Sequence, residues 1–169
     1  APYPTARHFK LDYEWFGEKV DGELKSDVDD KDDGVDIKYI GNKKLKVTVT
    51  ITTSGDVKRY NEHKLFVNGW FDWNSNGKWE KEELGITWKG VPDKYPSFRI
   101  EKEIDVPPVS NTEKSWARFR LNYGTAIDIE DATKDAYAGE VEDWDFVIHD
   151  VSMNRDVDYI QIIYSYVYD

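Results

Sequence analysis

The sequence predicts an all-β protein: an antiparallel β-sandwich, jelly-roll-like, with long acidic loops. Three observations lead to this class. Apolar and polar residues alternate with a period of two along much of the chain, helical periodicity is weak, and the connecting segments are rich in Gly, Pro, Asp and Asn. The 169 residues are enough for one domain, so we expect a single sandwich over residues 8–169 behind a mobile arm of residues 1–7.

The first expected strand covers residues 8–16, because apolar residues alternate with polar ones there and define one core-facing side: Phe9, Leu11, Tyr13 and Trp15. The clearest alternation spans residues 44–52, in which every second residue from Leu45 to Ile51 is apolar. Further strands are expected at 64–71, 97–105, 115–122, 142–149 and 158–168. Short helical turns are expected at Glu80–Leu84 and within 127–136.

The charge balance narrows the class of partner. The chain has 34 acidic and 23 basic side chains, a formal net charge of −11, and no cysteine. Such a surface argues against binding to nucleic acid or to anionic membranes, since both require basic faces. No apolar run is long enough for a membrane span. The start Ala1-Pro2-Tyr3-Pro4 is typical of a secreted protein after removal of its signal peptide, or of a trimmed chain, and the composition suits a thermophile.

The most specific motif is the segment 72–83, which matches the calcium-loop pattern D-x-[DN]-x-[DN]-G-x5-E at every required position. Ca²⁺ takes six to eight hard oxygen ligands, and the pattern places oxygens at alternate positions. The Lys78 carbonyl is also expected to bind. The predicted ligands are Asp72, Asn74, Asn76, Lys78, Glu80 and Glu83. A strand enters this loop, so it is not a true EF-hand, and a polar Asn-Gly hairpin turn is the alternative interpretation.

Two further acidic clusters are candidate calcium sites. The first lies within residues 26–36, where like charges repel one another unless cations or water neutralise them, and its best-placed ligands are Asp27, Asp29, Asp33 and Asp36. The alternative is a solvated acidic loop. The second cluster lies at a strand start and offers Glu140, Glu142 and Asp143. Strand alternation puts Glu140 and Glu142 on one side and Asp143 on the other, and a charged strand edge is the alternative.

Catalytic patterns are weak. The three histidines are far apart without metal-binding spacing, and no nucleophile or phosphate-binding motif occurs. Among the 34 acids no carboxylate pair stands out for glycoside hydrolysis, so a hydrolase is only a third hypothesis. The seven tryptophans either pack in the core or form a platform for sugars.

The segment Ala117–Gly124, followed by Ala138–Trp144 with the run Gly-Glu-Val-Glu-Asp at 139–143, resembles the GEVED domain of secreted prokaryotic proteins. Segments like Phe71–Gly77 and Asp32–Val35 occur in the same order in that family. The resemblance implies an extracellular, calcium-loaded β-sandwich without enzymatic activity. Two departures are the roughly twenty residues after the motif strand and the single-module organisation. Size, acidity and organisation also resemble, more loosely, the subunits of archaeal extracellular tubules, the cannulae.

The sequence therefore predicts a secreted, calcium-binding structural protein that assembles with copies of itself into filaments or tubules. We expect exchange of a terminal strand between subunits, with residues 8–16 as the first candidate. The alternative is a carbohydrate-binding or adhesion module in which calcium is a structural ion and the partner is a cell-surface glycan.

Overall fold

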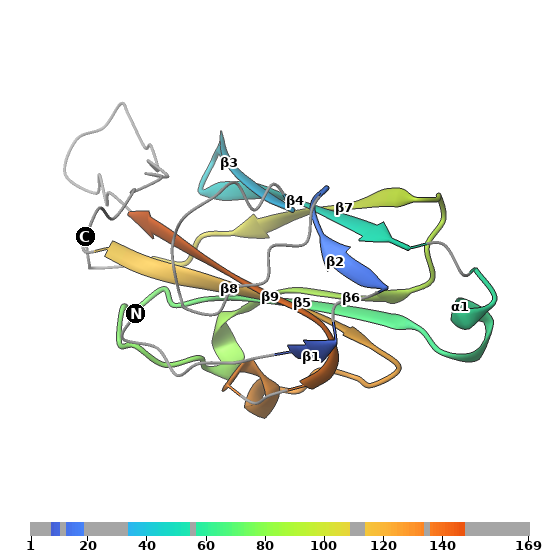
Figure 1. Ribbon diagram of the computed structural model, residues 1–169. Coiled ribbons are helices and arrows are strands. Elements are labelled where there is room, and N and C mark those ends of the chain that lie inside the picture. Colours follow the sequence, from blue (N-terminus) through green and yellow to red (C-terminus); the bar gives the residue numbers. More distant parts are fainter. Residues whose placement is uncertain are drawn as a thin grey trace, which may run out of the picture.

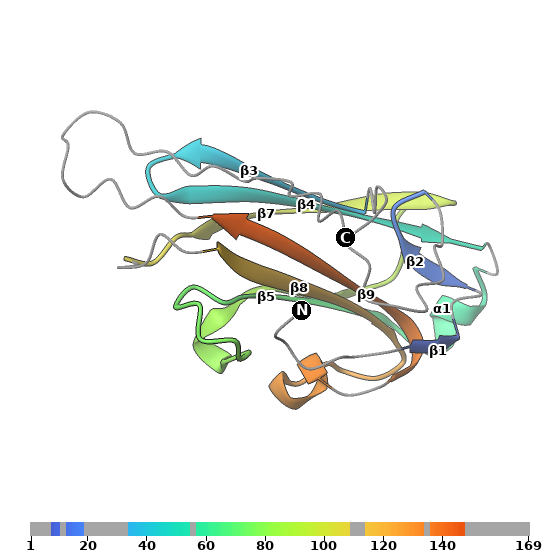
Figure 2. The same cartoon turned by 60° about the vertical axis from the view of Figure 1, so that its left-hand side comes forward.

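The structure is a computed structural model that describes residues 8–10, 13–18, 34–54, 57–108, 114–133 and 136–147 (Figure 1). These residues form nine strands and one short α-helix, and the strands make a five-stranded and a four-stranded sheet. Figure 2 shows the two sheets as stacked layers, with β3, β4 and β7 in one layer and β5, β8 and β9 in the other. The predicted β-sandwich is confirmed.

The five-stranded sheet has the order β1-β9-β8-β5-β6. Its neighbours pair antiparallel, except that β1 runs parallel to β9. The bounds of these strands are β1 His8–Lys10, β5 Leu65–Phe71, β6 Leu84–Gly90, β8 Lys114–Tyr123 and β9 Ala136–Val147.

The four-stranded sheet is built around β4, Lys44–Thr53. On one edge, β3 (Val35–Gly41) pairs with the first part of β4, and β2 (Glu14–Phe16) pairs with its last residues. On the other edge, β7 (Ser97–Asp105) pairs with nearly the whole of β4.

The core lies between the sheets, and the alternation expected at 44–52 produces much of it. Leu45, Val47, Val49 and Ile51 are all at most 2% exposed. The facing sheet contributes apolar residues from each of its three central strands, including Val67, Phe119 and Phe146. Burying each such side chain stabilises the fold by roughly 1.5–3 kcal/mol.

The segment 8–16 differs from its prediction. It is not one strand, because β1 belongs to the five-stranded sheet and β2 to the four-stranded sheet. The buried residues of β2 are Glu14 and Phe16, whereas Trp15 is only partly buried. The predicted core face is therefore wrong at β2. The physical reason is that Arg59 and Tyr60 hydrogen-bond to the Glu14 carboxylate and so allow its burial.

Other elements were found or missed as follows. The expected helical turns are present as the 3₁₀ helices η1 (Lys81–Glu83) and η2 (Ile129–Thr133). Strands β3 and β6 and the helix α1 (Arg59–Glu62) were not predicted. Strand β9 begins at Ala136, six residues before its predicted start. The expected arm 1–7 and strand 158–168 lie outside the described residues. No helix in the described part of the chain is long and apolar enough to cross a membrane.

Candidate metal centre

The predicted calcium loop begins where β5 leaves the core. Asp72, the first predicted ligand, is fully buried. Its backbone N–H donates to the Trp116 carbonyl at 2.9 Å, and its own carbonyl accepts a hydrogen bond from the Ser115 hydroxyl. Strand β8 therefore fixes the start of the loop at its backbone. Sequence reasoning missed Ser115 and Trp116, since only the β5–β8 pairing brings them to Asp72.

The Asp72 side chain shapes the turn that follows. Its Oδ1 accepts the Asn76 backbone N–H at 3.1 Å, and its Oδ2 accepts the Gly77 N–H at 2.9 Å. Gly77 has φ 76°, a left-handed conformation that glycine adopts without steric cost. Ser75 also has a positive φ, of 56°. The loop is thus folded around the buried carboxylate of Asp72.

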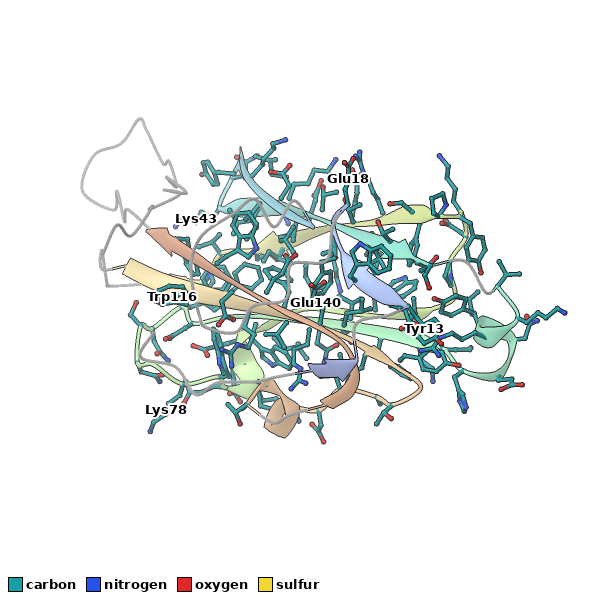
Figure 3. All side chains as sticks on the ribbon, viewed as in Figure 1. Tyr13, Glu18, Lys43, Lys78, Trp116 and Glu140 are labelled. Atoms are coloured by element: carbon teal, nitrogen blue, oxygen red, sulfur yellow. The ribbon has the colours of Figure 1, made fainter. Side chains whose placement is uncertain are left out.

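The asparagines lie against Glu80. The amide groups of Asn74 and Asn76 donate to Glu80 Oε2 at 2.9 and 3.1 Å. Their carbonyl oxygens accept backbone N–H groups of the loop, namely Asn76 N–H at Asn74 and Lys78 N–H at Asn76. The Lys78 side chain is exposed and lies at the outer edge of the loop (Figure 3). The predicted calcium ligand at Lys78 is its backbone carbonyl, not its side chain.

Glu83 closes the loop and is 3% exposed. It forms a capping box with Glu80 around η1, in which each side chain accepts the other residue's backbone N–H. Glu83 Oε2 is the acceptor for Glu80 N–H at 3.0 Å, whereas Oε1 is buried without a hydrogen-bond partner. The pKa of Glu83 is raised to about 7, mainly by burial and in part by the nearby charges of Asp72 and Glu80.

The residues of this loop fit a calcium ion by their chemistry. All the predicted side-chain ligands would supply hard oxygen, and one oxygen of Glu83 is buried without a hydrogen-bond partner. Within the described residues, however, no three His, Cys, Asp or Glu side chains are already drawn together as a ligand cluster. The carboxylates of Asp72, Glu80 and Glu83 accept N–H groups of the loop.

Aromatic side chains hold the loop on the sheet. Trp73 stacks on Phe71 with ring centroids 4.9 Å apart and packs in the main core. Trp79 packs in a second small core with Trp70 and Ala132, on the outer side of the five-stranded sheet. Figure 2 shows η1 and η2 on this same outer side. The two tryptophans thus attach the loop to both faces of the sheet.

The other predicted site residues that the structure describes lie in different places. Asp27, Asp29 and Asp33 lie outside the described residues. Asp36 lies on β3, where its carboxylate forms an ion pair with Lys38 at 2.8 Å. On β9, Glu140 and Glu142 are buried on the side facing β2, as expected from alternation. Asp143 is on the opposite side and pairs with Arg118.

The ion pair between the buried Glu14 and the partly buried Arg59 was not predicted from the sequence. Arg59 Nε and Nη2 donate to the two Glu14 oxygens at 2.5 and 3.1 Å, and the Tyr60 hydroxyl donates to Oε1 at 3.1 Å. The Arg59 guanidinium also lies 3.5 Å from the centre of the Tyr123 ring. The residues are 45 positions apart, so sequence spacing carries no sign of this pair.

Comparison with known protein families places part of this chain. Residues 66–147 match the family model of the GEVED domain. Comparison with the curated proteins gives no match, and comparison with the solved structures gives none either. The matched segment runs from β5 to the end of β9, so it contains the 72–83 loop and the motif at 139–143. The GEVED resemblance predicted from the sequence is confirmed over residues 66–147, which match the GEVED domain family.

Proposed function

We propose that this protein is a calcium-binding extracellular structural protein that assembles with copies of itself. The single observation that supports calcium binding most directly is the Glu83 carboxylate, which is buried beside Asp72 with one oxygen lacking a hydrogen-bond partner. A buried acceptor without a partner costs free energy unless a ligand satisfies it. A cation in the loop would bind that oxygen and neutralise the neighbouring charges.

Calcium is favoured over other metals by the donor types. The loop offers carboxylate, amide and backbone oxygens, with no cysteine in the chain and no histidine in the loop. Zinc and copper prefer nitrogen and sulfur ligands, and magnesium demands a tighter octahedral arrangement with retained water. Asp72, Asn74, Asn76, Glu80 and Glu83 would supply side-chain oxygens, and Lys78 its carbonyl.

An extracellular location is supported by the GEVED domain, which is a domain of secreted proteins. Extracellular calcium modules bind with dissociation constants of about 10⁻⁴–10⁻³ M, so weak sites are filled outside cells. A chain with a net charge of −11 repels its own copies. Calcium that neutralises acidic loops would reduce this repulsion and permit association. The looser resemblance to archaeal tubule subunits makes filaments or tubules the proposed form.

The proposal treats binding, rather than catalysis, as the function. The runner-up, a carbohydrate-binding module, would need tryptophans exposed in a row. All seven tryptophans lie in described parts of the chain, and each is buried or partly buried. This arrangement matches the core role expected for most of them and gives the sugar platform no support.

Two measurements test the proposal separately. Isothermal titration of calcium into the chelator-treated chain should give saturable binding, which magnesium at equal concentration does not reproduce. Light scattering and electron microscopy in millimolar calcium should then show ordered assemblies that chelator dissolves. Absence of binding would refute the calcium function. Binding without assembly would leave a calcium-stabilised monomer and refute the structural role.

A further inference from the structure

The motif Gly139–Asp143 lies in β9 and presents carboxylates to both sides of the five-stranded sheet. Gly139 has φ 128°, and a Cβ at this position would overlap the carbonyl oxygen of Leu121 on β8. Glycine is therefore needed for β9 to lie this close to β8 at the start of the motif. From this glycine onward the side chains alternate along β9. Glu140 lies on the inner side of the sheet, and Asp143 lies on the outer side.

The inner side of the motif contacts the N-terminal part of the chain. Glu140 accepts a hydrogen bond from the backbone N–H of Phe16, the last residue of β2. Strand β2 has three residues and belongs to the opposite sheet, so this bond joins the two layers. Glu142 also lies close to the opposite sheet. Its Oε1 is 2.6 Å from the position that a Cβ would take on Gly34, the residue immediately before β3.

The outer side of the motif holds a different segment. Asp143 accepts two hydrogen bonds from Arg118, at 2.7 Å from Nε and 2.6 Å from Nη2. The remaining Arg118 nitrogen, Nη1, donates to the Ala132 carbonyl in η2 at 2.8 Å. The same guanidinium lies 5.4 Å from the centre of the Trp79 ring. Arg118 is 3% exposed, so its charge depends on Asp143 for compensation.

We infer that the GEVED motif is a two-sided clamp. Through Glu140 it holds β2 against the inner face of the sheet, and through Asp143 and Arg118 it holds the segment 127–133 on the outer face. The three carboxylates cannot share one ion, because Asp143 lies across the sheet from Glu140 and Glu142. Their buried or charge-assisted hydrogen bonds to protein groups give the motif a structural role that needs no metal.

Hydrogen–deuterium exchange of the full chain, read by mass spectrometry in excess chelator, tests the two halves independently. Asp143→Ala should raise exchange in residues 127–133 at least tenfold and leave residues 13–18 unchanged. Glu140→Ala should do the reverse. Glu140→Gln keeps an oxygen acceptor for the Phe16 N–H and should restore most of the protection in 13–18. Asp105→Ala removes an exposed carboxylate on β7 and is the matched control, with no change in either segment.

Several outcomes would overturn the clamp. It fails if either alanine variant changes both segments equally while remaining folded, or if neither segment changes. It also fails if the variants differ from the unmodified chain only when calcium is present, since the carboxylates would then act as metal ligands. If Glu140→Ala does not fold, Glu140→Gln is compared with the unmodified chain: it removes the charge of the acceptor, so exchange should rise slightly in 13–18 and stay unchanged in 127–133. If Asp143→Ala does not fold, Arg118→Lys replaces it. Arg118→Lys loses the paired geometry, so it should loosen 127–133 alone.

Discussion

Glu83 and Asp72 stand at the two ends of the same loop, and the carboxyl group of Glu83 lies buried beside Asp72. Burial is the main reason why the pKa of Glu83 is raised to about 7, and the charges of Asp72 and Glu80 add to it. Hydrogen bonds from the backbone N–H groups of Glu80 and Asn74 act in the opposite direction. The loop therefore contains a group that changes charge near neutral pH, at the position proposed to complete the calcium site.

The first prediction concerns this pair of residues. Asp72→Asn removes one negative charge while keeping the side-chain shape, so calcium affinity should fall at least tenfold, or about 1.4 kcal/mol. Titration calorimetry at pH 8 measures the change. The control is Asp105→Asn, which removes the same charge from β7, where Asp105 forms an exposed ion pair with Lys44. It should leave the affinity nearly unchanged. Equal affinities in Asp72→Asn and the unmodified chain would show that the site is elsewhere.

The second prediction concerns the stability of the calcium-free chain. The folded-state pKa of Glu83 lies above its value of 4.5 in the unfolded chain, so the folded state holds the proton more tightly. This contribution to stability is fully present below pH 4.5 and is lost as pH rises through about 7. Urea unfolding in chelator should therefore show that the unmodified chain loses stability relative to Glu83→Gln between pH 5 and 8. A constant difference would contradict the raised pKa.

The third prediction follows from the same proton. Calcium binds the ionised carboxylate, so affinity should increase as pH rises from 6 to 8 because Glu83 must release its proton first. Glu83→Gln should bind more weakly and lose most of this pH dependence. Calorimetry in two buffers of different ionisation enthalpy measures the proton released on binding. Binding without proton release at pH 6.5 would exclude Glu83 as a ligand.

The fourth prediction concerns metal removal. An ion that binds only the folded state stabilises it by about 2.7 kcal/mol at a hundredfold excess over its dissociation constant. For a domain of this size, removing calcium should then lower the melting temperature by about 5–10 °C. Differential scanning calorimetry with calcium and with chelator gives the shift. Asp72→Asn should reduce it, and identical melting curves would contradict a structural calcium site.

Particular residues show what the sequence could and could not predict. The alternation at 44–52 predicted a strand and its buried face, because both depend on neighbours two residues apart. The motif at 72–83 could be recognised because its residue types have a fixed local spacing, and its role as a calcium site stays a prediction. In contrast, the burial of Glu14 depends on Arg59 and Tyr60. The partner of Asp143 likewise comes from another strand. Such pairs arise from strand register, which the alternation of one segment does not specify.

The fifth prediction concerns the N-terminal segment, whose strand β2 packs within its own sandwich in this structure. Deleting residues 1–16 removes the buried Phe16 and the buried carboxylate of Glu14. It leaves the Arg59 guanidinium without that carboxylate and Glu140 without the Phe16 N–H.

If strand exchange drives assembly, the truncated chain should stay folded, fail to polymerise in calcium, and bind a peptide of residues 1–16 saturably. If β2 only completes its own domain, the truncation should lower the melting temperature sharply, and the peptide should restore folding without supporting polymers. Calorimetric melting, light scattering and peptide titration separate these outcomes. Calcium-dependent polymers formed by the truncated chain alone would exclude this strand from assembly and make residues 158–168 the next segment to delete.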